Sequence, residues 1–145
     1  MLTVSTSENQ CTIAFPDEKV GFVKVVNFSK DKQVQCFKAH NSDIAAFKLS
    51  QDGNVLVTAS NKGTLLRMFN AHTGEQINEV RRGADQAVIT DVSIDPSNKL
   101  VCCASDKGTI HIFSVTTGED QQNRRSSMSV MSGMFSYFGS KWSFS

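Results

Sequence analysis

The sequence lacks the segments that mark a secreted or membrane-spanning protein. Its apolar runs are short, with Val55-Leu56-Val57 as an example, whereas a helix that spans a bilayer needs about 18 apolar residues in succession. The first six residues contain no basic segment followed by a long apolar one, so we expect no signal peptide. With two prolines and nine glycines in 145 residues, proline-rich and collagen-like classes are excluded as well.

The sequence also lacks an excess of either charge. Lysine and arginine total 15 and aspartate and glutamate 14, which gives a net charge of +1. A general electrostatic affinity for nucleic acid is therefore not indicated, and we expect no nucleic-acid partner. Hydrophobic residues at 39% and charged residues at 20% lie slightly below the averages of soluble globular proteins but far from those of disordered chains, and the length suits at most one ordinary domain.

Cysteine is scarce and lacks metal-binding spacing. The four cysteines are Cys11, Cys36, Cys102 and Cys103, and no two of them form a CxxC pair. Adjacent cysteines on a strand point to opposite faces. The pattern therefore favours neither a disulfide framework nor a metal site, and nothing in it indicates a cofactor. We expect reduced, mostly buried thiols in an intracellular protein.

A repeat occupies the middle of the chain. Residues 47–64 align without a gap to residues 92–109, at an offset of 45, and both copies contain Ala-Ser-(Asn/Asp)-Lys-Gly-Thr followed by an apolar run. Asp52-Gly53 and Asn61-Lys62-Gly63 are turn signals, with glycine in the positive-φ position. The expected strands are 12–15, 22–28, 33–37, 46–49, 55–60, 64–69 and 76–80.

Four short strands in about 45 residues are typical of a WD40-type β-propeller blade. We therefore predict an all-β fold of about three four-stranded antiparallel blades, in one partial propeller over residues 1–145. Its parts are a partial blade at 1–38, a blade at 39–83 and a blade at 84–145. Propellers close with about four to eight blades, so we expect a fragment of a larger ring, or one that needs its missing blades or another partner for completion.

Two successive arginines, Arg81 and Arg82, stand at the passage from the second blade to the third. Side chains alternate faces along an extended segment, so the two can serve two neighbouring pockets. The planar guanidinium fork suits phosphate, and Gly83 permits a sharp turn and close approach. The simpler interpretation is a solvated charge pair at the end of a strand.

Polar residues flank both repeated turns and begin the middle blade; they are Ser60, Thr64, Ser105, Thr109, His40 and His111. Hydroxyl groups, lysines and histidines beside an arginine favour a phosphate pocket. Alternatively, these are ordinary turn residues of WD40 blades, and His40 hydrogen-bonds within its own blade.

The end of the chain departs from the repeat. Residues 116–140 separate the third strand of the last blade from a strand-like segment at 141–144, and no acidic residue follows Asp120. The only tyrosine and the only tryptophan lie in the last eleven residues. A basic, aromatic-rich loop suits insertion at a lipid interface. The alternatives are a serine-rich disordered tail and apolar packing against a missing blade.

At these residues the sequence resembles the PROPPIN family, the WIPI-type β-propellers that bind phosphoinositides in autophagy. The resemblance covers nearly the whole chain. The family usually has Phe or Leu before Arg-Arg-Gly, where this chain has Val80, at a position that packs and does not bind phosphate. The matching segments are 59–69, 81–83, 104–113, 123–126 and 142–144.

The resemblance implies a seven-bladed ring, of which this chain resembles about the fourth to sixth blades, with two rim sites for phosphatidylinositol 3-phosphate and 3,5-bisphosphate. The first implied site comprises His40, Ser60, Lys62, Thr64 and Arg81. The second comprises Arg82, Ser105, Lys107, Thr109, His111 and Arg125. The implied membrane-inserting residues of the loop are Met131, Met134, Phe135, Tyr137 and Phe138.

By this resemblance the chain belongs to a membrane-recruitment module that acts in autophagosome assembly. It would be cytoplasmic and peripherally associated with autophagic or endosomal membranes. Its partners would be phosphoinositide-containing membranes and autophagy scaffold proteins. No nucleophile–base–orienter set occurs in the sequence, so we expect no enzyme. The alternatives are a WD40 protein–protein scaffold without lipid binding and a truncated, non-functional propeller fragment.

Overall fold

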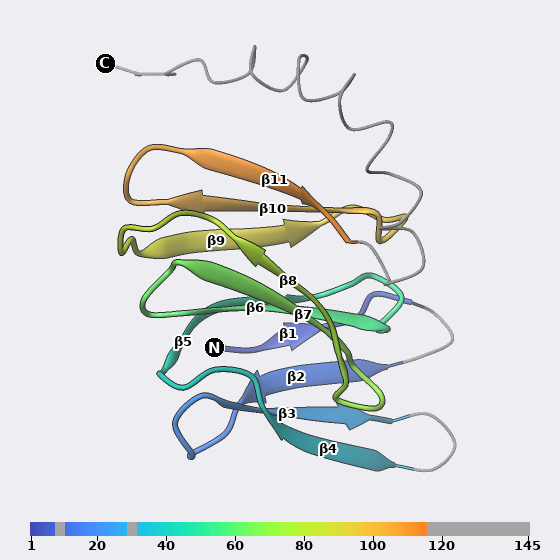
Figure 1. Ribbon diagram of the computed structural model, residues 1–145. Coiled ribbons are helices and arrows are strands. Elements are labelled where there is room, and N and C mark those ends of the chain that lie inside the picture. The colour runs from blue at the N-terminus through green and yellow to red at the C-terminus, as the bar shows by residue number, and fades with distance from the viewer. Residues whose placement is uncertain (8–10, 29–31, 116–145) are drawn as a thin grey trace.

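The chain folds into three antiparallel β-sheets in the computed structural model, which describes residues 1–7, 11–28 and 32–115 (Figure 1). The first sheet has the order β1 (Thr3–Val4), β2 (Thr12–Pro16), β3 (Phe22–Asn27) and β4 (Gln33–Lys38). The second has the order β5 (Ile44–Leu49), β6 (Val55–Ser60), β7 (Leu65–Asn70) and β8 (Gln76–Arg81). The third contains β9 (Ile89–Ile94), β10 (Leu100–Ser105) and β11 (Ile110–Ser114), with β10 in the middle.

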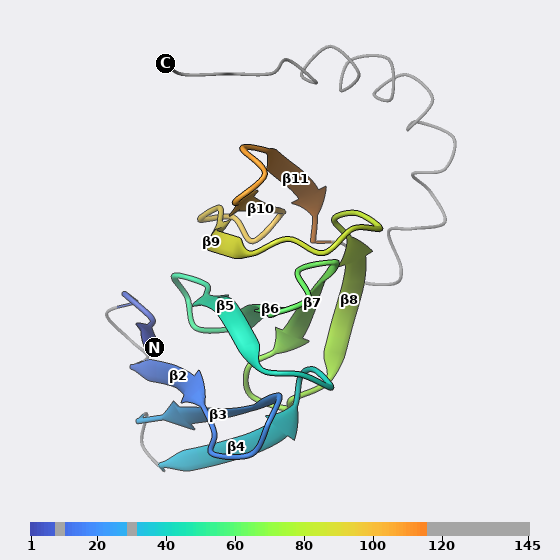
Figure 2. The same cartoon turned by 90° about the vertical axis from the view of Figure 1, so that its left-hand side faces the viewer.

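The sheets lie face to face as successive layers, with the second between the other two (Figures 1 and 2). Apolar side chains fill both gaps. Leu56 and Phe69 contribute to the core shared with the first sheet, and Val57 and Met68 to the core shared with the third. Because the second sheet is covered on both faces, every residue of β6 is buried. Such two-sided burial explains the nearly continuous apolar run of β6 in the sequence.

The three sheets repeat one glycine turn, and in the first two sheets this turn contacts the connection to the next sheet. Gly21, Gly63 and Gly108 occupy the turn between the second and third strands of their sheets, and all have positive φ, between 62° and 75°. A Cβ atom would lie 2.0 Å from the His40 carbonyl oxygen if placed on Gly21, and 1.8 Å from the Ala87 carbonyl oxygen if placed on Gly63. The chain thus enters each following sheet directly against the preceding turn. At Gly108 a Cβ would meet nothing within 4 Å among the described residues.

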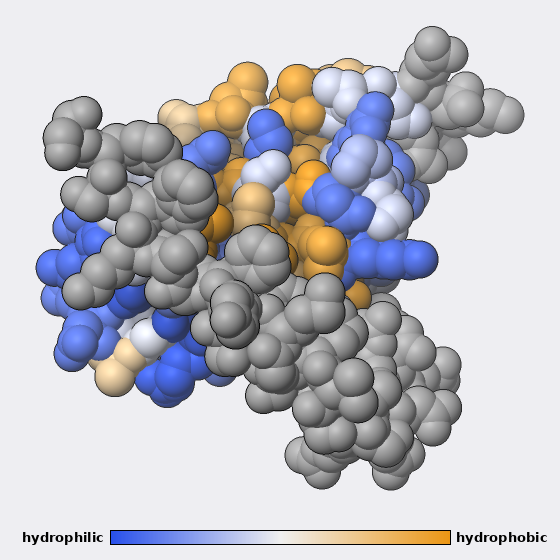
Figure 3. Space-filling view, turned by 90° about the horizontal axis from the view of Figure 1, so that it is seen from above, coloured by the Kyte–Doolittle hydropathy of each residue, from blue (hydrophilic) through white to orange (hydrophobic). Residues whose placement is uncertain are grey.

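The outer face of the third sheet carries exposed apolar side chains. Leu100, Ile110 and Ile112 are 47%, 73% and 55% exposed. Figure 3 looks onto this end of the stack and shows apolar side chains where the grey atoms leave the face visible. Together with the free turn at Gly108, this face is where a further blade of a propeller would pack.

The all-β, WD40-type propeller predicted from the sequence is confirmed, and the predicted strands agree with the structure to within two residues. β1 is not predicted, because two residues are too short to show alternation, and the third sheet is predicted only through its repeat of the second, without strand bounds. The predicted β5 starts two residues late, because the register shifts between Ile44 and Ala46 and breaks the pattern there. The predicted strand-like segment 141–144 and loop 116–140 lie outside the described residues.

The expectation of mostly buried cysteines is wrong. Only Cys103 is buried, Cys102 is half-buried, and Cys11 and Cys36 are exposed. Cys36 lies on β4, which pairs with β3 alone and so forms an outer edge of its sheet. Cysteine's general preference for the interior therefore does not hold at positions where the fold offers no covering layer.

Candidate functional site

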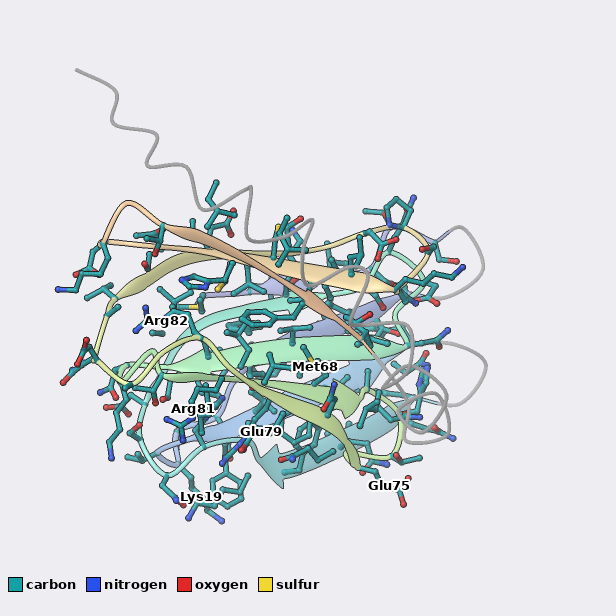
Figure 4. All side chains as sticks on the ribbon, turned by 45° about the horizontal axis from the view of Figure 1, so that its top comes forward. Lys19, Met68, Glu75, Glu79, Arg81 and Arg82 are labelled. Atoms are coloured by element: carbon teal, nitrogen blue, oxygen red, sulfur yellow. The ribbon has the colours of Figure 1, made fainter. Side chains whose placement is uncertain are left out.

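β8 ends at Arg81, and the side chains of Arg81 and of Arg82 directly after it lie on opposite sides of the second sheet (Figure 4). Val80 packs into the core shared with the third sheet. Arg81 pairs with Leu65, one residue further along, and alternation turns it towards the first sheet. Figure 4 shows Arg81 and Glu79 on one side of β8 and Arg82 on the other. The alternation expected from the sequence is therefore present.

Four residues of the first implied site lie near one rim of the second sheet. Ser60 ends β6 and is buried, while Thr64 is half-buried in the turn that follows. Lys62 and Arg81 are exposed. The Ser60–Arg81 side of this group faces the first sheet, because Ser60 and Leu65 adjoin across the β6–β7 turn and Leu65 pairs with Arg81. Two hydroxyl groups and two cations whose side chains have no bonded partner among the described residues are donors of the kind that bind phosphate.

The fifth residue, His40, is buried and already bonded. Its exposed fraction is 4%, and its Nε2 lies 2.9 Å from Thr58 Oγ1. Burial, assisted by the nearby positive charge of Arg67, lowers the pKa of His40 to about 4. The ring is therefore neutral at physiological pH and supplies no charge to a phosphate. The hydrogen bond within the blade, which the sequence analysis kept as an alternative, is present.

The low pKa of His40 predicts a pH-dependent stability. The unfolded chain binds this proton near pH 6.5 and the folded chain only near pH 4, so stability falls as pH decreases through this window. Between pH 7.5 and pH 5 we expect a loss of about 2 kcal/mol in the free energy of unfolding. Urea titrations at both pH values measure the loss, and His40→Gln should remove most of it. An equal loss in the variant would contradict the assignment to His40.

The second implied site lies between the second and third sheets. Arg82 donates from Nε to the Gly63 carbonyl and from Nη2 to the Asp85 carbonyl. Ser105 and Thr109 face each other across their turn, with their hydroxyl oxygens 3.1 Å apart. Ser105 is buried and Thr109 exposed, so this hydroxyl pair begins at the protein surface.

Electrostatics also place Arg82 beside the third sheet. Burial lowers the pKa of His111, and the positive charge of Arg82 lowers it further. Burial raises the pKa of Cys103, and Arg82 opposes that rise. The His111 ring stacks on Phe113, with ring centroids 6.2 Å apart and planes 5° apart. Arg82 thus lies near His111 and Cys103 of the third sheet, while Ser105 and Thr109 flank the turn between β10 and β11, in which Lys107 is exposed.

The remaining sequence predictions concern Gly83, Arg125 and the membrane-inserting loop. Among the described residues a Cβ on Gly83 would meet nothing within 4 Å, and its φ is not positive, so no contact within the described chain requires a glycine there. Arg125 and the five implied membrane-inserting residues lie outside the described residues. In residues 1–7, 11–28 and 32–115, no three His, Cys, Asp or Glu side chains gather as metal ligands, and no helix could cross a bilayer.

An ion pair that was not predicted from the sequence lies next to the first site. Arg67 and Glu79 lie opposite each other on β7 and β8, and Arg67 Nε is 2.7 Å from Glu79 Oε2. The feature of the sequence that could have indicated this ion pair is Arg67, the single charged residue in the apolar run 65–69. A buried strand accepts such a charge only where it finds a partner.

The fold and the rim residues define a class: a WD40-type β-propeller with an arginine on each side of one blade. The sequence profile of the PROPPIN family matches residues 1–141, and the chain belongs to this family. It is 41% identical over 104 residues to SVP1-like protein 2 of Neurospora crassa, covering 72% of this chain and 24% of that protein. It is 41% identical over 110 residues to autophagy-related protein 18e of Arabidopsis thaliana, covering 76% and 29%.

Solved propellers share the fold. Kluyveromyces lactis Hsv2 superposes with a TM-score of 0.71 at 25% identity, over 83% of this chain and 39% of that one. A complex of KlAtg21 with the coiled coil of AgAtg16 superposes with a TM-score of 0.63 at 28% identity, over 78% and 38%. The chain thus spans about a quarter to two fifths of the length of these proteins.

Proposed function

We propose that this chain is the phosphoinositide-binding part of a non-enzymatic membrane-recruitment propeller that acts in autophagy. The observation that carries the proposal is the placement of Arg81 and Arg82 on opposite faces of one sheet, with Arg81 on the side of the first sheet and Arg82 near His111 and Cys103 of the third. The ligands are phosphatidylinositol 3-phosphate and phosphatidylinositol 3,5-bisphosphate. The protein would be cytoplasmic and bind autophagic or endosomal membranes at their surface.

The chemistry of the two pockets supports phosphate binding. Arg81 and Lys62 offer charged donors at the first pocket, with Ser60 and Thr64 beside them. Arginine forms paired, charge-assisted hydrogen bonds with phosphate oxygens. Two sites on one rim can hold two headgroups of the same membrane, so their effects multiply even if each binds weakly.

The names of the relatives support the biological setting. One relative is named as an autophagy-related protein, and one solved neighbour, KlAtg21, is in complex with the AgAtg16 coiled coil. We infer that autophagy scaffold proteins are partners of the whole protein of which this chain covers a part. Neither lipid pocket includes residues of a partner, so binding of a coiled-coil protein and binding of lipid are separate parts of this proposal.

Single substitutions test whether there are two pockets. Arg81→Ala should disable the pocket with Ser60 and Thr64, and Arg82→Ala the pocket with Ser105 and Thr109. Each variant should lose one charge-assisted contact, about 1.5–3 kcal/mol, and keep part of its binding to liposomes that contain phosphatidylinositol 3-phosphate. Flotation measures both. If one variant loses all binding while the other behaves as the unmutated chain, the two-pocket proposal is wrong.

The segment 124–140 should add membrane insertion to headgroup binding. Each fully inserted apolar side chain contributes about 1.5–3 kcal/mol, and less in a partly wet interface. We expect serine at Met134, Phe135, Tyr137 and Phe138 to weaken liposome binding while binding of the soluble headgroup stays intact. Flotation and headgroup calorimetry on one preparation separate the two. Normal liposome binding by the variant would show that the segment does not insert.

A further inference from the structure

Arg67 connects the first sheet to the second directly behind the first pocket. Its Nε donates to Glu79 Oε2, and its Nη1 donates to the Ala39 carbonyl oxygen; each donor–acceptor distance is 2.7 Å. Ala39 precedes His40 in the segment that enters the second sheet. The guanidinium group therefore holds a backbone carbonyl of one connection and a carboxylate of β8 at the same time.

The segment at Ala39 and His40 is held from three directions. The N–H groups of both residues donate to the Gly21 carbonyl oxygen, at 2.8 and 3.0 Å. Thr58 Oγ1 bonds the His40 ring, and Arg67 bonds the Ala39 carbonyl. Arg67 thus belongs to the set of contacts that fixes the segment connecting the first sheet to the second.

The pair of Arg67 and Glu79 lies two residues from the pair of Leu65 and Arg81 along β7 and β8, further from the rim of the sheet. Arg67 pairs with Glu79, and Leu65 pairs with Arg81. Residues two apart on a strand share a face and lie about 7 Å apart, so Glu79 and Arg81 are neighbours on the side towards the first sheet (Figure 4). Glu79 is the carboxylate nearest in sequence to the arginine that the pocket needs, and its side chain is 38% exposed.

We propose that Arg67 is a positioning residue of the first phosphate pocket: it binds the Glu79 carboxylate and so leaves the Arg81 guanidinium free for phosphate. The role assigned to Arg67 is indirect: its Nε and Nη1 are bonded to Glu79 and Ala39. Without Arg67, the unpaired carboxylate of Glu79 would turn to Arg81, its neighbour on the same face, and compete with the ligand. This inference rests on the proposed binding of phosphate by Arg81.

The test measures the first pocket alone, in the full chain with Arg82→Ala to disable the second. The probe is inositol 1,3-bisphosphate, the soluble headgroup of phosphatidylinositol 3-phosphate, and the readout is its affinity by calorimetry. Adding Arg67→Met should weaken binding at least about tenfold, the equivalent of one charge-assisted contact. Adding Glu79→Gln as well should restore most of the affinity, because no carboxylate then remains to capture Arg81.

The restoration separates positioning from simple support of the fold. If Arg67 matters only because it links two sheets, Glu79→Gln cannot restore what Arg67→Met removes, and that outcome overturns the proposal. Unchanged affinity in Arg67→Met overturns it too. In a matched background with Arg81→Ala, where only the second pocket binds, Arg67→Met should leave the affinity unchanged, and a comparable loss there would again contradict the proposal.

Two further variants keep the test decisive. Should Arg67→Met fail to fold, Arg67→Lys replaces it: lysine still neutralises Glu79 but cannot reach both partners, so near-normal affinity supports the proposal and a tenfold loss overturns it. Glu79→Gln alone should bind at least as tightly as its parent. If the unmutated chain does not bind the headgroup, the proposed function fails; if it binds and Arg67→Met binds equally, only this inference fails.

Discussion

Replacing Arg81 and Arg82 together with threonine should lower the affinity for liposomes that contain phosphatidylinositol 3-phosphate by more than about a hundredfold, because two charge-assisted contacts of about 1.5–3 kcal/mol each are lost. The two side chains point to opposite faces of the second sheet, so no single pocket can compensate for the other. Flotation over a range of protein concentrations measures the change.

Two controls accompany the double variant. Circular dichroism should show unchanged sheet content, because Arg81 is exposed and, among the described residues, the side chain of Arg82 bonds to loop carbonyls at Gly63 and Asp85 and to no strand. Replacing both arginines with lysine keeps the charge but removes the planar fork, so binding should be intermediate. Undiminished binding by a folded threonine variant would rule out phosphate binding by these arginines.

Gly63→Ala should be the most destabilising small substitution in the second sheet. The new Cβ would lie 1.8 Å from the Ala87 carbonyl oxygen, and φ at this position is +62°. The connection into the third sheet must then move away, which separates the two sheets at this rim. We expect the free energy of unfolding to fall by about 3 kcal/mol or more, from overpacking together with the left-handed backbone.

Gly108→Ala is the matched control for this effect. Gly108 has the same position in its sheet and a φ of +68°, but a Cβ there meets nothing within 4 Å among the described residues. Alanine at this position should therefore lower the free energy of unfolding only by the cost of a left-handed backbone conformation, about 1–2 kcal/mol. The difference between the two variants in urea unfolding reports the contact between sheets. Equal losses would mean that the Gly63 contact adds nothing.

Local signals in the sequence predict most of the strands. Alternating apolar residues and turn glycines act over a few positions, so the repeat reveals β6, β7 and β10 without knowledge of their neighbours. The same signals fail for β1, which has only two residues, and for the start of β5, where the register shifts. Cysteine burial also fails, because exposure depends on which layer covers a strand.

The two arginines show how far a local rule reaches into the candidate site. Alternation along an extended chain is a property of the backbone, so opposite facing of Arg81 and Arg82 follows from their adjacency alone. Which neighbour each arginine faces does not follow. Arg82 lies beside the third sheet because Val80 before it packs into that core.

The sequence by itself determined the all-β class, the blade repeat, the turn glycines and the alternation of the arginines, because each depends on residues close together in the chain. Only the tertiary structure decided that His40 is neutral and bonded to Thr58, and that Arg67 joins Glu79 to the Ala39 carbonyl. Arg67 and Ala39 are 28 residues apart and meet only when two sheets stack. Burial and long-range hydrogen bonds arise from that stacking, and no local pattern encodes them.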